Sequence, residues 1–138
     1  MKKIIFILLL AFTFQISAQE QSNWITDNKV ALELSKTQNK PILAFVTNNQ
    51  KTEGLSVLNK EFFASKVYRS IEQKVILLKL DISNVQSYNV RLGIHYTKQT
   101  SAPGLALIDK YGNTILEPLV DMTPENITAF LTLLNANL

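Results

Sequence analysis

Continuous apolar runs alternate with amphipathic segments along the chain from Trp24 onward. The runs at residues 42–46 and 75–82 contain few polar residues, which is typical of strands buried on both faces of a sheet. In residues 27–38 and 53–73 the apolar residues recur at helical intervals, and this spacing predicts one amphipathic helix in each segment. The first half of the chain is therefore predicted to alternate helices with strands.

The second half of the chain predicts a short helix, a β-hairpin and a final helix. Residues 84–94 have the pattern of the short helix, and the apolar segments 104–109 and 114–120 flank a four-residue connection of the hairpin type. Residues 123–138 predict a helix that Thr123 caps. The order α-β-α-β-α-β-β-α implies an α/β fold, with helices on both faces of one mixed sheet of about four strands.

The first 18 residues have the pattern of a secretory signal peptide. Two lysines precede an apolar run, and small residues before Ala18-Gln19 fit a cleavage site. The apolar run is shorter than the ~20 residues that span a bilayer, so we expect no stable membrane insertion after cleavage. The predicted organisation is a signal peptide at 1–18 and one domain at 19–138, exported to a periplasm or secreted.

Composition excludes several classes of function. The leader holds two of the fourteen basic residues and none of the eleven acidic ones, which leaves a net charge of +1 on the remainder. This remainder also contains no run of basic residues that would indicate nucleic acid as a partner. The chain has no cysteine and a single histidine, His95, so the common zinc sites are unsupported and we expect neither a metal nor a cofactor.

Several strings resemble the thioredoxin-like family in their order and spacing. "NKPILAFV" is similar to the strand that leads to the family's active site, and "KEFFASKVYRSIEQKVILLKLD" to the helix and strand that follow it. "RLGI" and "APGLALIDKYGNTI" are similar to the segments around the family's active-site proline. The resemblance covers residues 24–138 and implies a three-layer α/β/α sandwich of the thioredoxin type.

The same alignment places the family's CxxC motif on "TEGL", which is Thr52, Glu53, Gly54 and Leu55. Thiol–disulfide exchange needs an attacking thiolate and a second sulfur, and a threonine hydroxyl supplies neither. Thiol–disulfide oxidoreductase activity is therefore excluded for these 138 residues. The four residues instead suit the start of a helix, with Thr52 as N-cap and Glu53 in the first turn. The alternative is that residues 48–54 contact a partner.

The resemblance also implies that Pro103 is a cis proline beside the former active site. The main chain of Ala102 would then be available for strand-like pairing with a peptide. The alternative is that Pro103 only shapes the fold. Compared with thioredoxins, the residues before this proline, 95–101, form an insertion. We expect a loop there, for which two interpretations stay open. In one, His95 and Tyr96 stack or hydrogen-bond to a ligand and Lys98 meets an acidic one; in the other, the insertion is a surface loop without a binding role.

The function predicted from the sequence is that of an exported, redox-inactive thioredoxin-like domain, descended from an oxidoreductase, that binds or assembles with another envelope or secreted protein or peptide. Two alternatives stay open. One is a non-redox enzyme that reuses the same cleft with His95, Glu53 or Lys98. The other is a subunit that associates through an exposed sheet edge.

Overall fold

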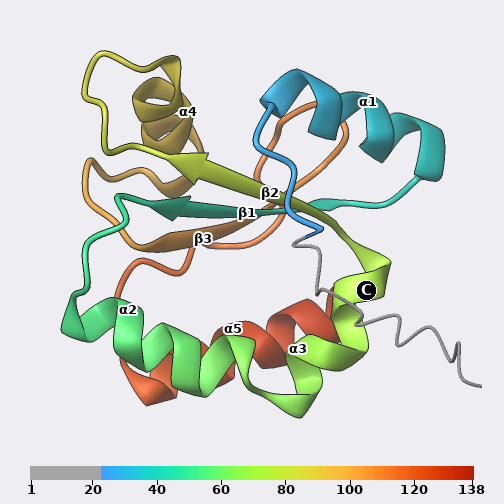
Figure 1. Ribbon diagram of the computed structural model, residues 1–138. Coiled ribbons are helices and arrows are strands. Elements are labelled where there is room, and N and C mark those ends of the chain that lie inside the picture. Colours follow the sequence, from blue (N-terminus) through green and yellow to red (C-terminus); the bar gives the residue numbers. More distant parts are fainter. Residues whose placement is uncertain (1–22) are drawn as a thin grey trace, which may run out of the picture.

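The computed structural model describes residues 23–138, so the predicted signal peptide lies outside the described residues. Helices lie on both sides of a central sheet, α1 and α4 on one face and α2, α3 and α5 on the other (Figure 1). None of the helices in the described part combines the length and apolar character that crossing a bilayer requires. The helices and strands are α1 (Asn28–Gln38), β1 (Ile42–Thr47), α2 (Glu53–Leu58), α3 (Lys66–Ile71), β2 (Ile76–Asp81), α4 (Tyr88–Thr97), β3 (Gly104–Ile108) and α5 (Pro124–Asn137).

The sheet has the strand order β2-β1-β3, with β1 in the centre. β1 pairs in parallel with β2, so that Ala44 is opposite Leu78, and antiparallel with β3, so that Ala44 is also opposite Ala106. All six residues of β1 are buried. This confirms the prediction of a mixed sheet whose central strand is covered on both faces.

The prediction of about four strands is wrong by one strand. Residues 114–120 form isolated bridges to β3, between Ile108 and Thr114 and between Leu105 and Leu119, but no continuous ladder. Pro118 has no N–H to donate to a ladder, and the chain rejoins β3 at Leu119, whose N–H and C=O both bond to Leu105 at 2.9 Å. The expected hairpin is therefore a strand and an irregular return segment.

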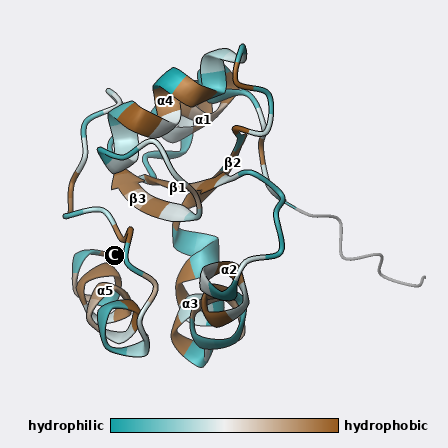
Figure 2. Cartoon of the chain, turned by 90° about the vertical axis from the view of Figure 1, so that its left-hand side faces the viewer, coloured by the Kyte–Doolittle hydropathy of each residue, from teal (hydrophilic) through white to brown (hydrophobic). Residues whose placement is uncertain are grey.

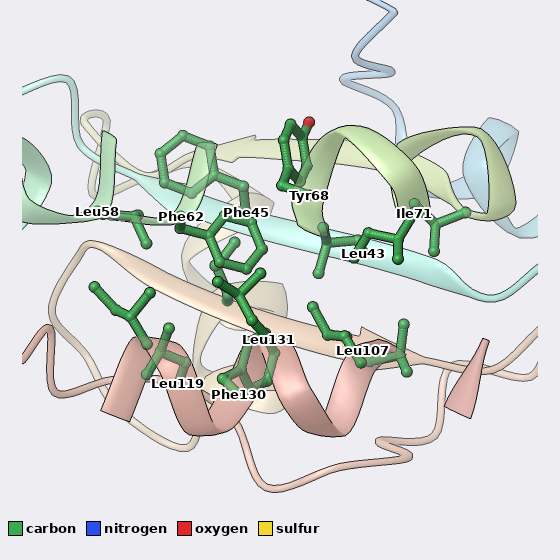
Figure 3. Packing of buried hydrophobic residues seen from close by; sticks show 14 of the residues in the cluster. Leu43, Phe45, Leu58, Phe62, Tyr68, Ile71, Leu107, Leu119, Phe130 and Leu131 are labelled. Carbon is green, nitrogen blue, oxygen red and sulfur yellow. The ribbon is translucent and has the colours of Figure 1, made fainter. Parts of the chain in front are cut away.

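Two apolar cores lie on opposite faces of the sheet, and apolar colour is concentrated on the strands between the helical layers (Figure 2). Alternate residues of β1 enter each core, as a period of two requires. Leu43 and Phe45 face the larger core, where the rings of Phe62 and Phe130 lie 6.2 Å apart between centroids (Figure 3). The sheet therefore supplies apolar residues to both helical layers.

The predicted single helix over residues 53–73 is wrong in its continuity. A π-helical turn over Asn59–Phe63 follows α2, and α3 starts anew with Ser65 as its N-cap. The wider turn lets two consecutive side chains pack inward, Phe62 against Phe130 and Phe63 against Phe45, whose ring centroid is 5.3 Å away. Periodicity alone does not reveal this break, because the apolar spacing continues through it.

The segment before α1 is attached to the edge of β2. The N–H of Ile25 donates to the Leu77 carbonyl, and its carbonyl accepts from the N–H of Lys79, both at 2.8 Å. Trp24 packs against the rings of Phe45 and Phe63, with its centroid 5.9 Å from each. This segment thus fixes the position of the chain just before α1 starts.

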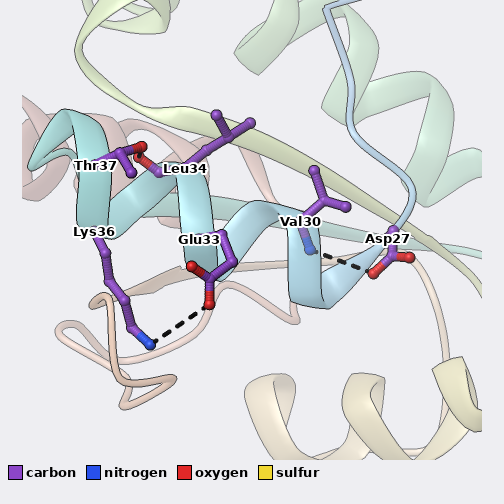
Figure 4. Close-up of polar contacts among 6 residues, drawn as sticks. All are labelled: Asp27, Val30, Glu33, Leu34, Lys36 and Thr37. Atoms are coloured by element: carbon purple, nitrogen blue, oxygen red, sulfur yellow. Dashed lines mark hydrogen bonds and ion pairs between the residues drawn. The ribbon is translucent and has the colours of Figure 1, made fainter.

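Side-chain oxygens fix the start of α1. Asp27 is the N-cap, and its carboxylate accepts a hydrogen bond from the N–H of Lys29 at 2.8 Å. It accepts a second one from the N–H of Val30 at 3.4 Å (Figure 4). In its last turns the exposed Lys36 and Glu33 approach to 3.9 Å, a pair that contributes little to stability in water. The helix ends at Asn39, which has left-handed backbone angles.

Candidate functional site

The loop between β1 and α2 is held in place by hydrogen bonds to the loop after β2. The Nδ2 of Asn49 donates to the Asp81 carboxylate at 2.7 Å, and the Ser83 hydroxyl oxygen lies 2.8 Å from the carbonyl oxygen of Asn48. Hydrogen bonds from the hydroxyl and N–H of Ser83, with smaller effects from Asn49 and Lys79, lower the pKa of Asp81. Asp81 is thus a turn residue that joins the two loops.

The residues Thr52 to Leu55 start α2. The Thr52 hydroxyl accepts a hydrogen bond from the Leu55 N–H at 3.1 Å, and Glu53 lies in the first turn. Both arrangements stabilise the positive end of a helix. Thr52 and Glu53 are exposed, whereas Leu55 packs partly against the larger core. The N-cap predicted from the sequence is confirmed.

Three segments that are distant in the sequence meet at this helix start. A β-carbon built on Gly54 would lie 3.7 Å from Cβ and Cγ of Met122 and 3.8 Å from Cδ of Pro103. The Ala102-Pro103 peptide bond is cis. We call Thr52, Gly54, Ala102, Pro103 and Met122 the proline face.

The segment before Pro103 is fixed by Gln99. Its amide Nε2 donates to the Pro103 carbonyl at 3.4 Å, and its Oε1 accepts from the Ser101 hydroxyl at 3.1 Å. Gly104 allows the close approach of this segment, because a β-carbon there would lie only 2.9 Å from Cγ2 of Thr97. Both loops of the proline face are therefore held by side-chain contacts.

Solved structures with similar folds are known. One is described as "DsbH Oxidoreductase", with a TM-score of 0.65 and 21% identity over 82% of this chain and 81% of that chain. A disulphide isomerase from Xylella fastidiosa Temecula1 matches at a TM-score of 0.55 and 19% identity, over 75% of this chain and 85% of its own. The C-terminal domain of Neisseria meningitidis DsbD in the oxidised form matches at 0.56 and 13%, over 79% and 97%.

The chain has a thioredoxin-like fold. No family model matches the sequence, and the search of curated proteins found no match. At these identities the similarity defines the fold alone. The function of this chain therefore has to be inferred from its own residues, beginning with those of the proline face.

The predicted ligand contacts before Pro103 need correction in this thioredoxin-like domain. Residues 95–97 are not in a loop, because α4 continues to Thr97 and ends at Lys98, which has left-handed backbone angles. Tyr96 is only 2% exposed, and its hydroxyl donates to Oδ1 of Asn28 at 2.8 Å. Tyr96 therefore joins α4 to α1 and is not available for a ligand.

His95 and Lys98 are exposed at the end of α4, where the Lys98 ammonium donates to the main-chain carbonyl of His95 at 2.7 Å. Glu53 belongs to α2, in the helical layer on the other side of the sheet (Figure 1). No side-chain hydrogen bond or ion pair joins these three residues in the part of the chain that the structure describes. The residues of the enzymatic alternative are thus not assembled into an acid–base pair.

Residues 23–138 contain no cluster of His, Asp and Glu side chains that could hold a metal ion. The proline face offers main-chain groups, one hydroxyl that caps a helix, and apolar side chains. In these residues, neither the N–H nor the C=O of Ala102 makes an intramolecular hydrogen bond. Such a face can pair with an extended backbone, but it supplies no nucleophile.

Sequence reasoning missed two residues of the site, Met122 and Gln99. Met122 reaches Gly54 across nearly seventy positions, and only the return of the chain beneath the sheet brings it there. Gln99 is one of several polar residues in its segment. Neither has a local sequence pattern that marks it.

Proposed function

We propose that this chain is an exported, redox-inactive thioredoxin-like domain that binds an extended segment of another envelope or secreted protein at the proline face. The free main-chain groups of Ala102, beside a site without a nucleophile, carry the proposal. Pairing through the main chain needs no sulfur. Export rests on the signal-peptide pattern at 1–18.

The composition of the proline face supports binding over redox chemistry. The position that a thioredoxin would give to its attacking sulfur holds Thr52, whose hydroxyl oxygen is engaged with the Leu55 N–H. The 138 residues contain no cysteine, so neither a mixed disulfide nor its resolution is possible within this chain.

The fixed loops around the proline face also favour binding. Asn49 and Ser83 hold one loop through Asp81 and the Asn48 carbonyl, and Gln99 holds the other through Pro103. A surface that is already ordered loses less conformational entropy when a partner binds. Gly54 and Met122 add a small apolar surface on which a partner's side chain can rest.

Site-specific photo-crosslinking tests the proposal. A benzophenone amino acid placed at Ser101, which is exposed beside Ala102, is expected to capture a defined set of envelope or secreted proteins. Gly54→Leu should abolish the capture, because the larger side chain fills the space in front of Pro103 and Met122. Ala129→Leu adds the same kind of side chain at an exposed site on α5 and should leave capture unchanged.

A second probe position and a redox assay complete the test. A crosslinker at Thr132, exposed on α5, should not capture the same proteins. Identical adducts from both positions, or adducts that survive Gly54→Leu, would contradict binding at the proline face. The redox half of the proposal fails if the protein accelerates insulin reduction by dithiothreitol.

A further inference from the structure

We infer that the outer side of α4 is a second recognition surface, which binds an acidic protein segment through its carboxylates and one apolar side chain. The surface consists of Val85, Tyr88, Arg91, Ile94, His95 and Lys98, which we call the α4 patch. It goes beyond the proposed function, because α4 lies on the opposite side of the sheet from α2 (Figure 1).

The α4 patch contains three exposed large apolar side chains. Val85 is 78% exposed, Tyr88 is 66% exposed and Ile94 is 40% exposed. Arg91, Ile94, His95 and Lys98 follow one another at intervals of i, i+3, i+4 and i+7, so they lie along one side of the helix. Leu92 and Tyr96 on the other side fill the core.

The charge of the patch defines its partner. No aspartate or glutamate occurs between residues 82 and 108, whereas this stretch contains the cationic Arg91 and Lys98. The one ion pair in the described residues joins Lys36 to Glu33, so Arg91 has no carboxylate partner there. Tyrosine and arginine are the residue types most enriched among binding hot spots, and a cationic patch is complementary to an acidic segment.

A hollow in the patch can receive an apolar side chain. An open hollow of about 430 Å³, with mainly polar atoms exposed in its lining, lies between Val85, Tyr88, Val90 and Arg91, and Gln86 and Ser87 complete its wall. Pockets that hold an anchoring side chain are typical of the centre of an interface. An apolar residue between two acidic ones would place its side chain in the hollow and a carboxylate near Arg91.

The loop that carries the exposed valine is held by hydrogen bonds. The N–H of Ser87 donates to the Asn84 carbonyl at 2.9 Å, and the N–H of Gln86 donates to Oδ1 of Asn84 at 3.0 Å. Asn89 joins the helix start to the end of β2, since its Nδ2 donates to the Asp81 carbonyl at 3.2 Å. The patch is thus built in advance of binding.

Fluorescence anisotropy with a labelled peptide of sequence EELFEELE tests the inference. The isosteric peptide QQLFQQLQ is expected to bind more weakly than the acidic peptide by about tenfold or more. Added salt should weaken binding of the acidic peptide. Arg91→Glu and Tyr88→Ala should each weaken it by about tenfold. Arg69→Glu makes the same charge change at an exposed site on α3 and should change binding by less than about twofold.

Several results would overturn the inference. They are equal binding of the two peptides, equal losses in Arg91→Glu and Arg69→Glu, or no binding at millimolar protein. A dimer that Arg91→Glu disperses in light scattering would mean that a second copy covers the patch, which also overturns an acidic-segment partner. Gly54→Leu should bind the acidic peptide like the wild type, so failure here is distinguishable from failure of the proline face.

Discussion

Gly54 at the start of α2 lies in van der Waals reach of Pro103, because a β-carbon on Gly54 would be 3.8 Å from the proline Cδ. The two residues are almost fifty positions apart in the sequence. Their contact joins the helix that follows the central strand to the segment that precedes β3. It places the start of α2 beside the Ala102-Pro103 segment of the proline face.

Alanine substitutions at two glycines are expected to change stability in opposite directions. At Gly104 the added carbon would lie 2.9 Å from Cγ2 of Thr97, so Gly104→Ala should lower the free energy of unfolding by about 1–3 kcal/mol. At Gly54 the closest atoms are 3.7 Å away. Since alanine favours the helix, Gly54→Ala should raise the free energy of unfolding by up to about 1 kcal/mol.

Urea unfolding followed by circular dichroism measures both changes. Equal losses of stability in the two variants would show that the space around Gly54 is as restricted as that around Gly104. Such a result would contradict the finding that the space between Gly54 and Pro103 accommodates a β-carbon.

Cysteines placed at Thr52 and Leu55 are expected to form an intramolecular disulfide on oxidation. The Thr52 side chain already reaches the main chain of Leu55, as the 3.1 Å hydrogen bond shows. Mass spectrometry should find a loss of two hydrogens in Thr52→Cys/Leu55→Cys and none in the single variant Thr52→Cys. A folded double variant that stays reduced under glutathione disulfide would count against the assignment of these positions to the CxxC motif.

The Tyr96 hydroxyl is expected to stabilise the packing of α4 against α1. It donates to Oδ1 of Asn28 at 2.8 Å from a ring that is 2% exposed. Tyr96→Phe removes the donor and should lower the free energy of unfolding by about 1–2 kcal/mol. Tyr111→Phe removes the hydroxyl of a ring that is 73% exposed, so an equal loss there would exclude a specific role for the Tyr96 hydrogen bond.

Alkaline stability is expected to depend on Tyr68. Burial, with a smaller effect from Glu72, raises the pKa of Tyr68 from its ordinary value of 10.0 to about 12. The folded chain favours the neutral form of Tyr68, so this preference contributes fully to the free energy of unfolding below pH 10. The contribution is lost as the pH rises from 10 to about 12.

Urea unfolding across this pH range tests the dependence on Tyr68. The free energy of unfolding should fall less steeply in Tyr68→Phe than in the wild type, whereas Tyr111→Phe should retain the full decrease. If the free energy of unfolding of Tyr68→Phe fell with pH as steeply as that of the wild type, Tyr68 would titrate alike in the folded and unfolded chain.

Local patterns were sufficient to predict the three strands of the sheet and the N-caps of α2 and α5. The unbroken apolar run at residues 42–46 predicted a strand covered by a helical layer on each face, and β1 is buried on both faces. Thr52 and Thr123 were predicted as N-caps, and both accept the expected main-chain hydrogen bonds. These features depend on neighbours within a few positions, which the sequence displays directly.

Features that depend on distant neighbours could not be predicted. Residues 95–97 were expected in a loop, but the buried contact of Tyr96 with Asn28 keeps them helical. The π-helical turn before Ala64 depends on Phe62 and Phe63 packing against different partners. Met122 joined the proline face only when the fold brought residues after β3 beside α2.

The attachment of Ile25 to β2 bears on the behaviour of this protein at high concentration. Its two main-chain hydrogen bonds occupy the Leu77 carbonyl and the Lys79 N–H, the groups that a strand from a neighbouring molecule would need. An unoccupied strand edge is a template for aggregation. Removal of Ile25 would therefore expose these two groups at the edge of β2, where a strand of a neighbouring molecule could pair with them.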